Sequence, residues 1–312
     1  MSINKPLRIV YMGSPEFAVP GLEAIHKSPH EICAVVSGFD KRRGRGNQTS
    51  PTPVKQKAID LDIPVFEAED MRSQELHDYI SDLNPDMIVI VAFKILPSSL
   101  IAVPKIGAIN LHASLLPAYR GAAPIHHAVI QGEEKTGNTI FFLDSKIDTG
   151  EILLQKEIPI GQNETTGEVY ERLMHLGGEM LPEALDLISG GEYTLSKQDD
   201  SLASKAPKIF PDDAKIDLDL DALSIHNLIR GMSPFPGAWG LLDGKKLKIY
   251  RTEIQNTAST NKATGRLFIE DGKAYLECKD GALILSELQY EGRQRMNGYD
   301  FLLGYQDNAI LN

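Results

Sequence analysis

Cysteine is nearly absent from this chain. Its 312 residues include only two, Cys33 and Cys278, which lie far apart and lack the spacing of metal ligands. This excludes a disulfide framework and favours a reducing, cytoplasmic compartment. Because no cluster of cysteines is present, we also expect no bound metal.

Long hydrophobic runs are lacking as well. The longest obvious apolar run, Met87 to Phe93, is bounded by Asp86 and Lys94, and a membrane-spanning helix needs roughly 20 apolar residues. The N-terminus shows no signal-peptide pattern. We therefore expect a protein without a membrane partner, and nothing in the sequence points to an obligate protein partner.

Positive charge is in deficit. The 32 Lys and Arg residues against 43 Asp and Glu leave a net charge of −11, which argues against nucleic acid as a partner because phosphate contacts dominate such affinity. From residue 207 onward, however, 13 basic residues face 15 acidic ones. Since salt screens charges beyond roughly 8 to 10 Å, a local basic patch can still bind phosphate.

The first two thirds of the chain read as alternating strands and helices. Strands are predicted at 7–12, 31–36, 64–66 and 87–92, with helical patterns between them, and a Thr165-x-x-Glu168 capping box precedes a long amphipathic helix. Such alternation is typical of a doubly wound, mostly parallel α/β sheet. We expect this Rossmann-like domain to span residues 1–200.

The last third has a different pattern. A small, polar linker at 201–206 precedes one helix at 223–229 and five strands at 237–242, 245–253, 265–269, 273–278 and 282–289. Asp243-Gly244 and Asp271-Gly272 are typical hairpin turns. We therefore expect residues 207–312 to form a small, mostly antiparallel β-barrel of the OB type.

Two polar side chains end an apolar strand in the segment 107–150. The two-residue period of a strand places Asn110 and His112 on the same face, while Leu111 points the other way. Polar groups at the end of a buried strand need partners or a function. A histidine at such a place is more often structural, and the Asp148-Thr149-Gly150 that follows is, taken alone, usually a turn.

The combination of these motifs is more specific than any one of them. The Asn-x-His-x-Ser-Leu-Leu-Pro run from Asn110 to Pro117, then Arg120-Gly121 and Asp148-Thr149-Gly150, resembles the core of the 10-formyltetrahydrofolate-dependent formyltransferases. This resemblance implies formyl transfer from 10-formyltetrahydrofolate to an amine, with Asn110, His112 and Asp148 as catalytic residues. It also implies a folate site formed by Lys94, Leu96, Ser114, Leu115, Leu116, Pro117 and Asp144.

The chemistry of these residue types fits that reaction. The amide of Asn110 can donate to the oxygen that gains negative charge when the amine adds. An imidazole such as that of His112 suits the movement of a proton from the amine to the folate nitrogen. Asp148 can orient the ring and stabilise its cation.

Other parts of the chain resemble the methionyl-tRNA formyltransferase family in particular. They are the run 8–20, the Gly44-Arg45-Gly46 in a basic loop at 37–53, and motifs at 206–209, 230–238 and 289–292. The resemblance implies initiator methionyl-tRNA as the formyl acceptor, bound through Arg42, Arg43, Arg45 and Lys208. The two-residue period of the basic strand at 245–253 puts Lys246 and Lys248 on one face, where we also expect tRNA contacts. Two positions depart from the family: Ser37-Gly38-Phe39 replaces Thr-Gln-Pro, and Leu218 replaces a common Trp.

Alternatives remain open at this stage. The basic loop and the lysine-rich strand at 245–253 can be ordinary solvated surfaces. The acceptor can instead be glycinamide ribonucleotide or the amine of a nucleotide-linked sugar, although the second domain and the basic loop favour tRNA. A non-enzymatic RNA-binding protein is a further alternative, which the intact Asn110, His112 and Asp148 disfavour.

Overall fold

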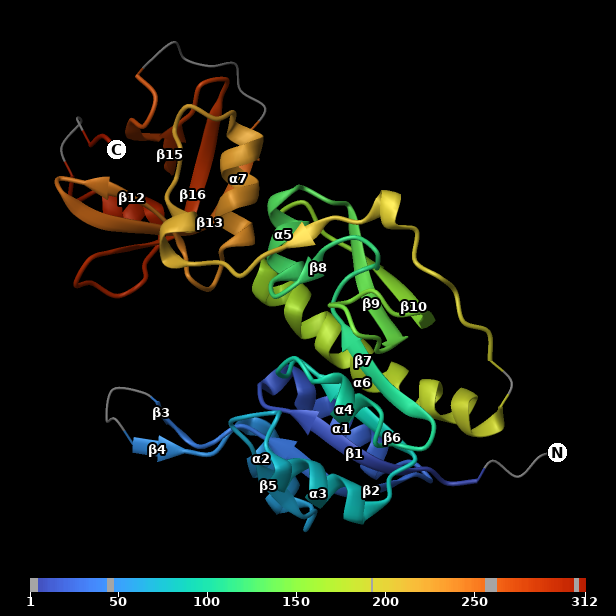
Figure 1. Cartoon of the computed structure of the whole chain (residues 1–312). Helices are drawn as coiled ribbons and strands as arrows, with labels where there is room; N and C mark the ends of the chain where they lie inside the picture. Colours follow the sequence, from blue (N-terminus) through green and yellow to red (C-terminus); the bar gives the residue numbers. More distant parts are fainter. Residues whose placement is uncertain (1–4, 44–47, 192, 256–262, 306–308) are drawn as a thin grey trace. The chain divides into compact units, whose positions relative to one another are not determined.

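The computed structural model describes residues 5–43, 48–191, 193–255, 263–305 and 309–312, which form two compact units (Figure 1). The N-terminal unit comprises Met1–Gly121, Gly137–Ile158 and Tyr170–Lys205; the C-terminal unit comprises Ala122–Thr136, Pro159–Val169 and Ala206–Asn312. The C-terminal unit thus contains two segments, 122–136 and 159–169, that lie inside the 1–200 domain expected from the sequence. The expected linker at 201–206 overlaps the 3-10 helix η2 (Asp200–Leu202) and strand β11 (Lys205–Ala206), which pairs with β8 (Arg120–Gly121).

A seven-stranded sheet forms the centre of the N-terminal unit, in the order β10-β9-β7-β6-β1-β2-β5. Its strands are β1 (Arg8–Gly13), β2 (Glu31–Ser37), β5 (Val65–Glu67), β6 (Met87–Val91), β7 (Gly107–His112), β9 (Lys135–Phe142) and β10 (Ile152–Pro159). Five neighbouring strands, β7, β6, β1, β2 and β5, are parallel to one another, and β9 runs antiparallel to β7. The prediction of a doubly wound, mostly parallel sheet is confirmed.

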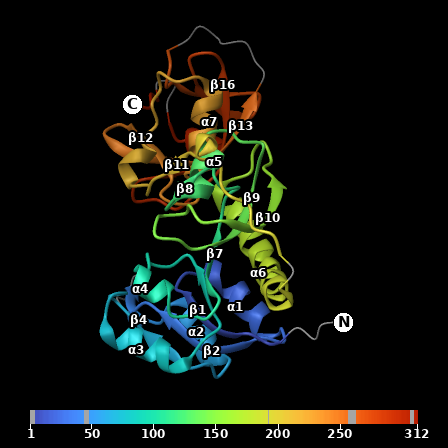
Figure 2. The ribbon, with the colours of Figure 1, turned by 45° about the vertical axis from the view of Figure 1, so that its right-hand side comes forward.

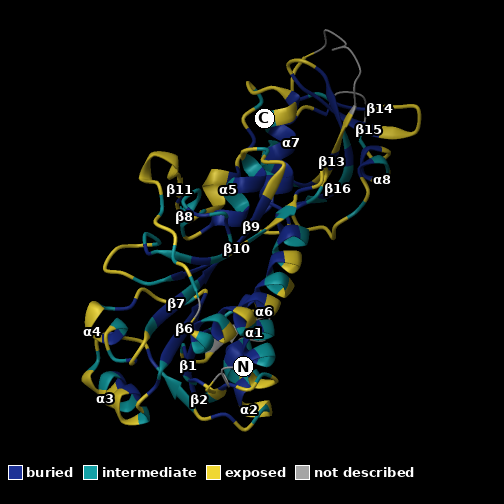
Figure 3. Ribbon diagram, turned by 90° about the vertical axis from the view of Figure 1, so that its right-hand side faces the viewer, coloured by how far each residue is buried: buried dark blue, intermediate teal, exposed yellow. Residues whose placement is uncertain are grey.

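Helices cover both faces of this sheet (Figure 2). Leu76 of α3 (Gln74–Leu83) and Leu100 of α4 (Ser98–Ile101) pack on one face, against alternate strand residues such as Ile88. On the other face, α1 (Val19–His26) and α6 (Thr166–Gly190) approach so closely that a Cβ on Gly21 would overlap the side chain of Leu181. Because both faces are covered, strands β1 and β6 are buried along most of their length (Figure 3).

Local sequence features set where the helices begin and end. The 3-10 helix η1 (Glu16–Ala18) leads into α1, and the side chain of Thr52 caps α2 (Pro53–Asp60) by accepting from the backbone N–H of Lys55. The predicted capping box also forms: the Glu168 carboxylate accepts from the backbone N–H of Thr165 at 2.8 Å, and the Thr165 hydroxyl accepts from that of Glu168 at 3.4 Å.

The C-terminal unit is built on a five-stranded antiparallel sheet. Its order is β12-β13-β16-β15-β14, with β12 (Ala238–Leu242), β13 (Lys245–Gln255), β14 (Leu267–Glu270), β15 (Lys273–Glu277) and β16 (Ala282–Tyr290). Both residues of each predicted turn, Asp243-Gly244 and Asp271-Gly272, have positive φ, as a two-residue type I′ hairpin requires. The helices of this unit are η3 (Pro211–Ala214), α5 (Pro124–Ile130), α7 (Ala222–Gly231) and α8 (Gly298–Leu302).

Residues 309–312 connect the two edges of this sheet. The backbone of Asn312 exchanges two hydrogen bonds with Leu241 of β12, at 2.7 and 2.8 Å. On the other side, the N–H of Leu311 donates to the carbonyl of Gly265, and the N–H of Leu267 in β14 donates to the carbonyl of Ala309. The segment therefore bridges the outer strands, which gives the barrel-like form expected from the sequence.

Buried polar side chains of α7 hold the segment 159–169 within the C-terminal unit. His226 contacts the carbonyl of Gln162 at 3.0 Å through Nε2, and Arg230 donates to the carbonyls of Gly161 and Glu164. Ile130 at the end of α5 also packs against this unit's core, in contact with Gly231. These contacts join residues 64 or more positions apart in the sequence, so no local pattern reveals them.

The helices that the structure describes include none with both the length and the apolar character needed to cross a bilayer.

The bridging segment gives a stability prediction. Leu311 is 1% exposed and Ile310 beside it is 44% exposed, so Leu311→Ala should lower the free energy of unfolding by about 2 to 5 kcal/mol. Ile310→Ala, the matched control, should change it by only about 0.5 kcal/mol. Urea unfolding followed by circular dichroism measures both, and equal small effects would contradict the structural role of this segment.

Candidate active site

Strand β7 carries the two polar residues singled out in the sequence. Asn110 lies between Ile90 of β6 and Phe141 of β9, and His112 lies opposite Thr139. The alternation of the strand puts both side chains on the face that Ala108 shares with the α3 and α4 cluster. His112 is 6% exposed, whereas Asn110 is less buried and reaches a pocket.

The ring of His112 is held between a backbone carbonyl and a carboxylate. Its Nε2 lies 2.9 Å from the carbonyl oxygen of Tyr119, which can only accept, so Nε2 carries the hydrogen. Its Nδ1 lies 3.9 Å from Oδ2 of Asp148, beyond hydrogen-bond distance. A proton taken up at Nδ1 would therefore face a negative charge. The structure thus brings together His112 and Asp148, which are 36 positions apart in the sequence.

Asp148 is itself fixed by the backbone. Its Oδ2 accepts from the N–H of Gly121 at 2.9 Å, and the residue has a positive φ of 54°. The third position of the Asp-Thr-Gly motif requires glycine, because a Cβ on Gly150 would overlap the carbonyl of Phe142. The motif is therefore a tight turn that returns the chain to the sheet and leaves the Asp148 carboxylate beside His112.

A glutamine that the sequence analysis missed supports this turn. The side chain of Gln198 donates to the carbonyls of Asp148, at 3.0 Å, and Gly150, at 2.8 Å. Its oxygen accepts from Nε and Nη2 of Arg120, which also pairs with Asp200. Arg120 is thus engaged by Gln198 and Asp200. No local motif marks Gln198, since its partners are backbone groups about 50 residues away.

The loop after β7 is held by a buried hydroxyl. Thr139 Oγ1 donates to the carbonyl of Ser114 at 2.6 Å and accepts from the N–H of Leu116 at 3.1 Å. It accepts a third hydrogen bond from Nε2 of Gln155, at 2.8 Å. The hydroxyl of Ser114 donates to the carbonyl of Ala118. This network fixes the loop whose next residue, Tyr119, binds His112.

A pocket of about 120 Å³ opens beside Asn110. It brings together five of the predicted site residues, namely Asn110, Asp148, Lys94, Leu96 and Asp144. The other predicted folate residues, at positions 114–117, are not among its lining residues, and Ser114 and Leu116 are buried. The lining set therefore covers only part of the predicted site, and the folate role of residues 114–117 stays a prediction.

The rim of this pocket has apolar residues that the sequence analysis did not select. Ile95 is 73% exposed and Ile147 is 56% exposed, and both line the pocket together with Phe93. An isoleucine between two charged residues is the sequence feature that could have marked Ile147, which stands between Lys146 and Asp148. Exposed apolar side chains around polar groups are typical of small-molecule sites.

Backbone and side-chain contacts order the two loops at this rim. Nζ of Lys94 donates to the carbonyls of Ala68, at 3.3 Å, and Glu69. The carboxylate of Asp144 accepts from the N–H of Lys146 and from the hydroxyl of Thr149, each at 2.8 Å. The side chains of Lys94 and Asp144 therefore hold the loops that form the pocket.

The predicted tRNA-binding residues fall in three places. Arg42 and Arg43 belong to β3 (Lys41–Arg43), which pairs with β4 (Gln48–Ser50), and Arg45 lies outside the described residues. On β13, Lys246 is exposed and Lys248 is half-buried, while Leu247 between them points into the core. Burial, together with the charges of Lys246 and Arg295, lowers the pKa of Lys248. Lys208 lies 5.3 Å from the ring centre of Phe210.

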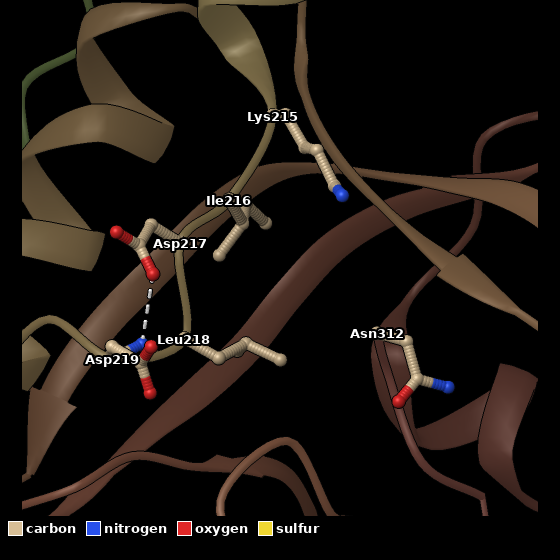
Figure 4. A pocket seen from close by; sticks show the side chains of 6 residues that line it. All are labelled: Lys215, Ile216, Asp217, Leu218, Asp219 and Asn312. Atoms are coloured by element: carbon tan, nitrogen blue, oxygen red, sulfur yellow. Dashed lines mark hydrogen bonds between the residues drawn. The ribbon is translucent and has the colours of Figure 1, made fainter.

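A second pocket, of about 330 Å³, belongs to the C-terminal unit (Figure 4). It is lined by residues 215–219 and by Asn312, and the N–H of Asp219 donates to the Asp217 side chain there. Leu218, the residue that departs from the family pattern, is one of its walls. No predicted site residue lies in this pocket.

Both parts of the chain match models of known protein families. Residues 7–185 match the model of the formyl transferase family, and residues 208–306 match that of the formyl transferase C-terminal domain. A methionyl-tRNA formyltransferase of Citrifermentans bemidjiense is 45% identical over 303 residues, which cover 96% of this chain and 94% of the relative. One of Chlorobium luteolum is 43% identical over 305 residues, covering 96% and 97%.

Solved structures share the fold at lower identity. The N-formyltransferase of Helicobacter canadensis in complex with folinic acid and dTDP-3-aminofucose has a TM-score of 0.69 at 20% identity, covering 92% of this chain and 100% of that one. HypX of Aquifex aeolicus in complex with tetrahydrofolic acid has a TM-score of 0.61 at 15% identity, covering 96% and 47%. At these identities the likeness establishes the fold alone.

The Thr139 network gives a prediction with an internal control. Thr139→Val leaves the N–H of Leu116 and the amide of Gln155 without this acceptor, so it should lower stability by about 1 to 3 kcal/mol. Thr136, also buried in β9, has a hydroxyl with no hydrogen-bond partner among the described residues, so Thr136→Val should be neutral or stabilising. Differential scanning calorimetry compares the two, and equal losses would contradict a special role for the Thr139 hydroxyl.

Proposed function

The chain belongs to the formyl transferase family, and we propose that it transfers a formyl group from 10-formyltetrahydrofolate to the α-amino group of methionine on initiator methionyl-tRNA. The product is N-formylmethionyl-tRNA, which serves translation initiation. The observation that carries this proposal is the 43 to 45% identity with methionyl-tRNA formyltransferases over nearly the whole length of both chains. Such coverage includes the C-terminal unit as well as the site.

The geometry around Asn110 supports the catalytic roles. Asn110 and Asp148 line the same pocket, and Asp148 faces His112. As the amine adds to the formyl carbon, the formyl oxygen gains negative charge, and the Asn110 amide can donate a hydrogen bond to it. One such donor typically lowers the barrier by about 3 to 4 kcal/mol. In this proposal Asn110 stabilises the charge and transfers no proton.

His112 and Asp148 serve the movement of a proton. The attacking amine must lose a proton, and N10 of the folate gains one when its bond to the formyl carbon breaks. The Tyr119 carbonyl keeps a hydrogen on Nε2, so Nδ1 is the atom free to take up the proton. The carboxylate of Asp148 offsets the positive charge that the ring then carries. In this proposal Gln198 positions Asp148 and does not touch a substrate.

The pocket beside Asn110 supports folate as the formyl donor. A flat pterin ring suits the apolar side chains of Ile95, Ile147 and Leu96, while Asp144 and Asp148 offer acceptors to its N–H groups. Ser114, Leu115, Leu116 and Pro117 complete the proposed folate site as predicted from the sequence. We propose no metal in this reaction, because the proton movement and the charge stabilisation are assigned to protein side chains.

The acceptor is tested directly by formyl transfer from 10-formyltetrahydrofolate to three candidates. These are methionyl-initiator tRNA, the same tRNA uncharged, and a nucleotide-linked aminosugar. We expect product on the charged tRNA alone. Product on the sugar alone would refute the tRNA assignment and leave the proposed roles of the catalytic residues intact. No formyl transfer to any amine would refute the assignment as an enzyme.

His112 gives a sharper test of the mechanism. His112→Ala should lower kcat roughly 100-fold or more, the contribution expected of a group that moves the proton. His175→Ala removes an exposed histidine of α6 and should leave kcat unchanged. Circular dichroism on both variants confirms folding, and a folded His112→Ala enzyme with near-normal kcat would overturn this role.

A further inference from the structure

A loop of the C-terminal unit presents an aromatic ring to solvent. Residues 232–237 connect α7 to β12, and Phe235 in this loop is 74% exposed. A single exposed apolar residue is common on protein surfaces and has no meaning by itself. The way in which the loop is held makes this one different.

Every carbonyl of this loop from position 232 to 236 accepts a hydrogen bond. The carbonyl of Met232 accepts from Gly237 N at 2.8 Å, and that of Ser233 accepts from Gly167 N at 3.0 Å. Side chains bond to the other three: Arg295 Nη2 to Pro234 at 3.5 Å, His126 Nε2 to Phe235 at 3.2 Å, and Lys248 Nζ to Pro236 at 2.7 Å. Surface loops are usually mobile, and many of their carbonyls bond to water and not to protein groups. This loop is anchored on both sides of Phe235, so the ring is presented by a fixed backbone.

Two of those donors are cations, and a third cation lies close to them. Lys246 and Arg295 are near enough to Lys248 to lower its pKa. Lys246 lies 4.1 Å from the ring centre of Trp239, and Arg295 lies 3.5 Å from that of Tyr250. Arg295 also has a weak ion pair with Glu287, at 3.8 Å. Three like charges held close together repel one another, and an anion bound beside them would offset that repulsion.

The close packing under this surface is specific to the loop. Gly237 has a φ of +84°, and a Cβ there would come within 2.8 Å of the Tyr250 ring and 3.3 Å of the Lys248 side chain. The glycine therefore lets the loop lie directly on Lys248, which is one of the cations, and on Tyr250, whose ring contacts Arg295. The ring of Phe235 and the cations are thus parts of one ordered surface, which consists of Phe235, Lys246, Lys248 and Arg295.

We propose that Phe235 is a stacking platform for an unpaired base of the tRNA, with Lys246, Lys248 and Arg295 contacting the phosphates beside that base. The proposal rests on the proposed function, in which tRNA is the substrate. A flat exposed ring beside cations matches single-stranded RNA, whose bases stack on aromatic side chains and whose backbone is anionic. An acidic peptide would use the cations but has no flat group that requires Phe235.

The test uses the full chain and three variants, Phe235→Ala, Phe235→Trp and Leu303→Ala. Leu303 is a 62% exposed apolar residue of the same unit and serves as the matched control. Fluorescence anisotropy gives the Kd for labelled uncharged initiator tRNA and for a blunt-ended RNA duplex without unpaired bases. Formyl-transfer kinetics give KM for methionyl-tRNA and kcat separately.

Loss of one base stack should raise the Kd and KM for tRNA about tenfold or more in Phe235→Ala. Phe235→Trp should retain wild-type values because it keeps a flat ring, and Leu303→Ala should change nothing. The Kd for the duplex and kcat should stay within about twofold of wild type in all variants, since neither depends on stacking.

The outcomes separate this proposal from the proposed function. If the wild-type protein formylates methionyl-tRNA and Phe235→Ala does so with the same KM and Kd, the platform is refuted and the function stands. If Phe235→Ala weakens binding to the duplex as much as to tRNA, the ring does not act through an unpaired base, and the platform is again refuted. If the wild-type protein formylates no tRNA and binds none, both proposals fail.

Discussion

The hydroxyl of Thr139 holds together the part of the structure on which the site depends. It connects β9 to the loop that leaves β7, and that loop ends at the carbonyl that fixes the His112 ring. The orientation of the imidazole is therefore set by a chain of hydrogen bonds that begins in the sheet. On the other side of the ring, Gln198 fixes the turn that carries Asp148. His112 and Asp148 are thus positioned by neutral groups that do not compete for their charge.

Much of the fold follows from patterns that are local in the sequence. The alternation of strands and helices, the two Asp-Gly hairpins and the Thr165-Glu168 capping box all depend on neighbouring residues, and all are present in the structure. The placement of Asn110 and His112 on one face follows from the period of a strand. The pocket places Asn110 with Asp148, two residues that the family resemblance named together, and their catalytic roles stay predictions.

What the sequence could not show depends on distant backbone groups. Gln198 binds carbonyls, and any residue supplies a carbonyl, so no residue type marks its partners. The same holds for His226 and Arg230, which bind the carbonyls of the 159–169 segment and thereby place that segment in the C-terminal unit. The exposed rim residues Ile95 and Ile147 were missed because single apolar residues in loops are common on protein surfaces. The roles predicted for the residues at 114–117 and for the basic loop stay predictions.

The composition of the C-terminal unit has a consequence for how the protein is made. Helix α5 and the segment 159–169 are synthesised well before α7, although all three belong to the same compact unit. Ile125, Ala128 and Val129 of α5 are buried in the finished structure. During translation these side chains leave the ribosome before α7 exists to pack against them. The apolar side chains of α5 therefore stay without their partner helix until α7 has been synthesised, and exposed apolar surface of this kind is what chaperones bind.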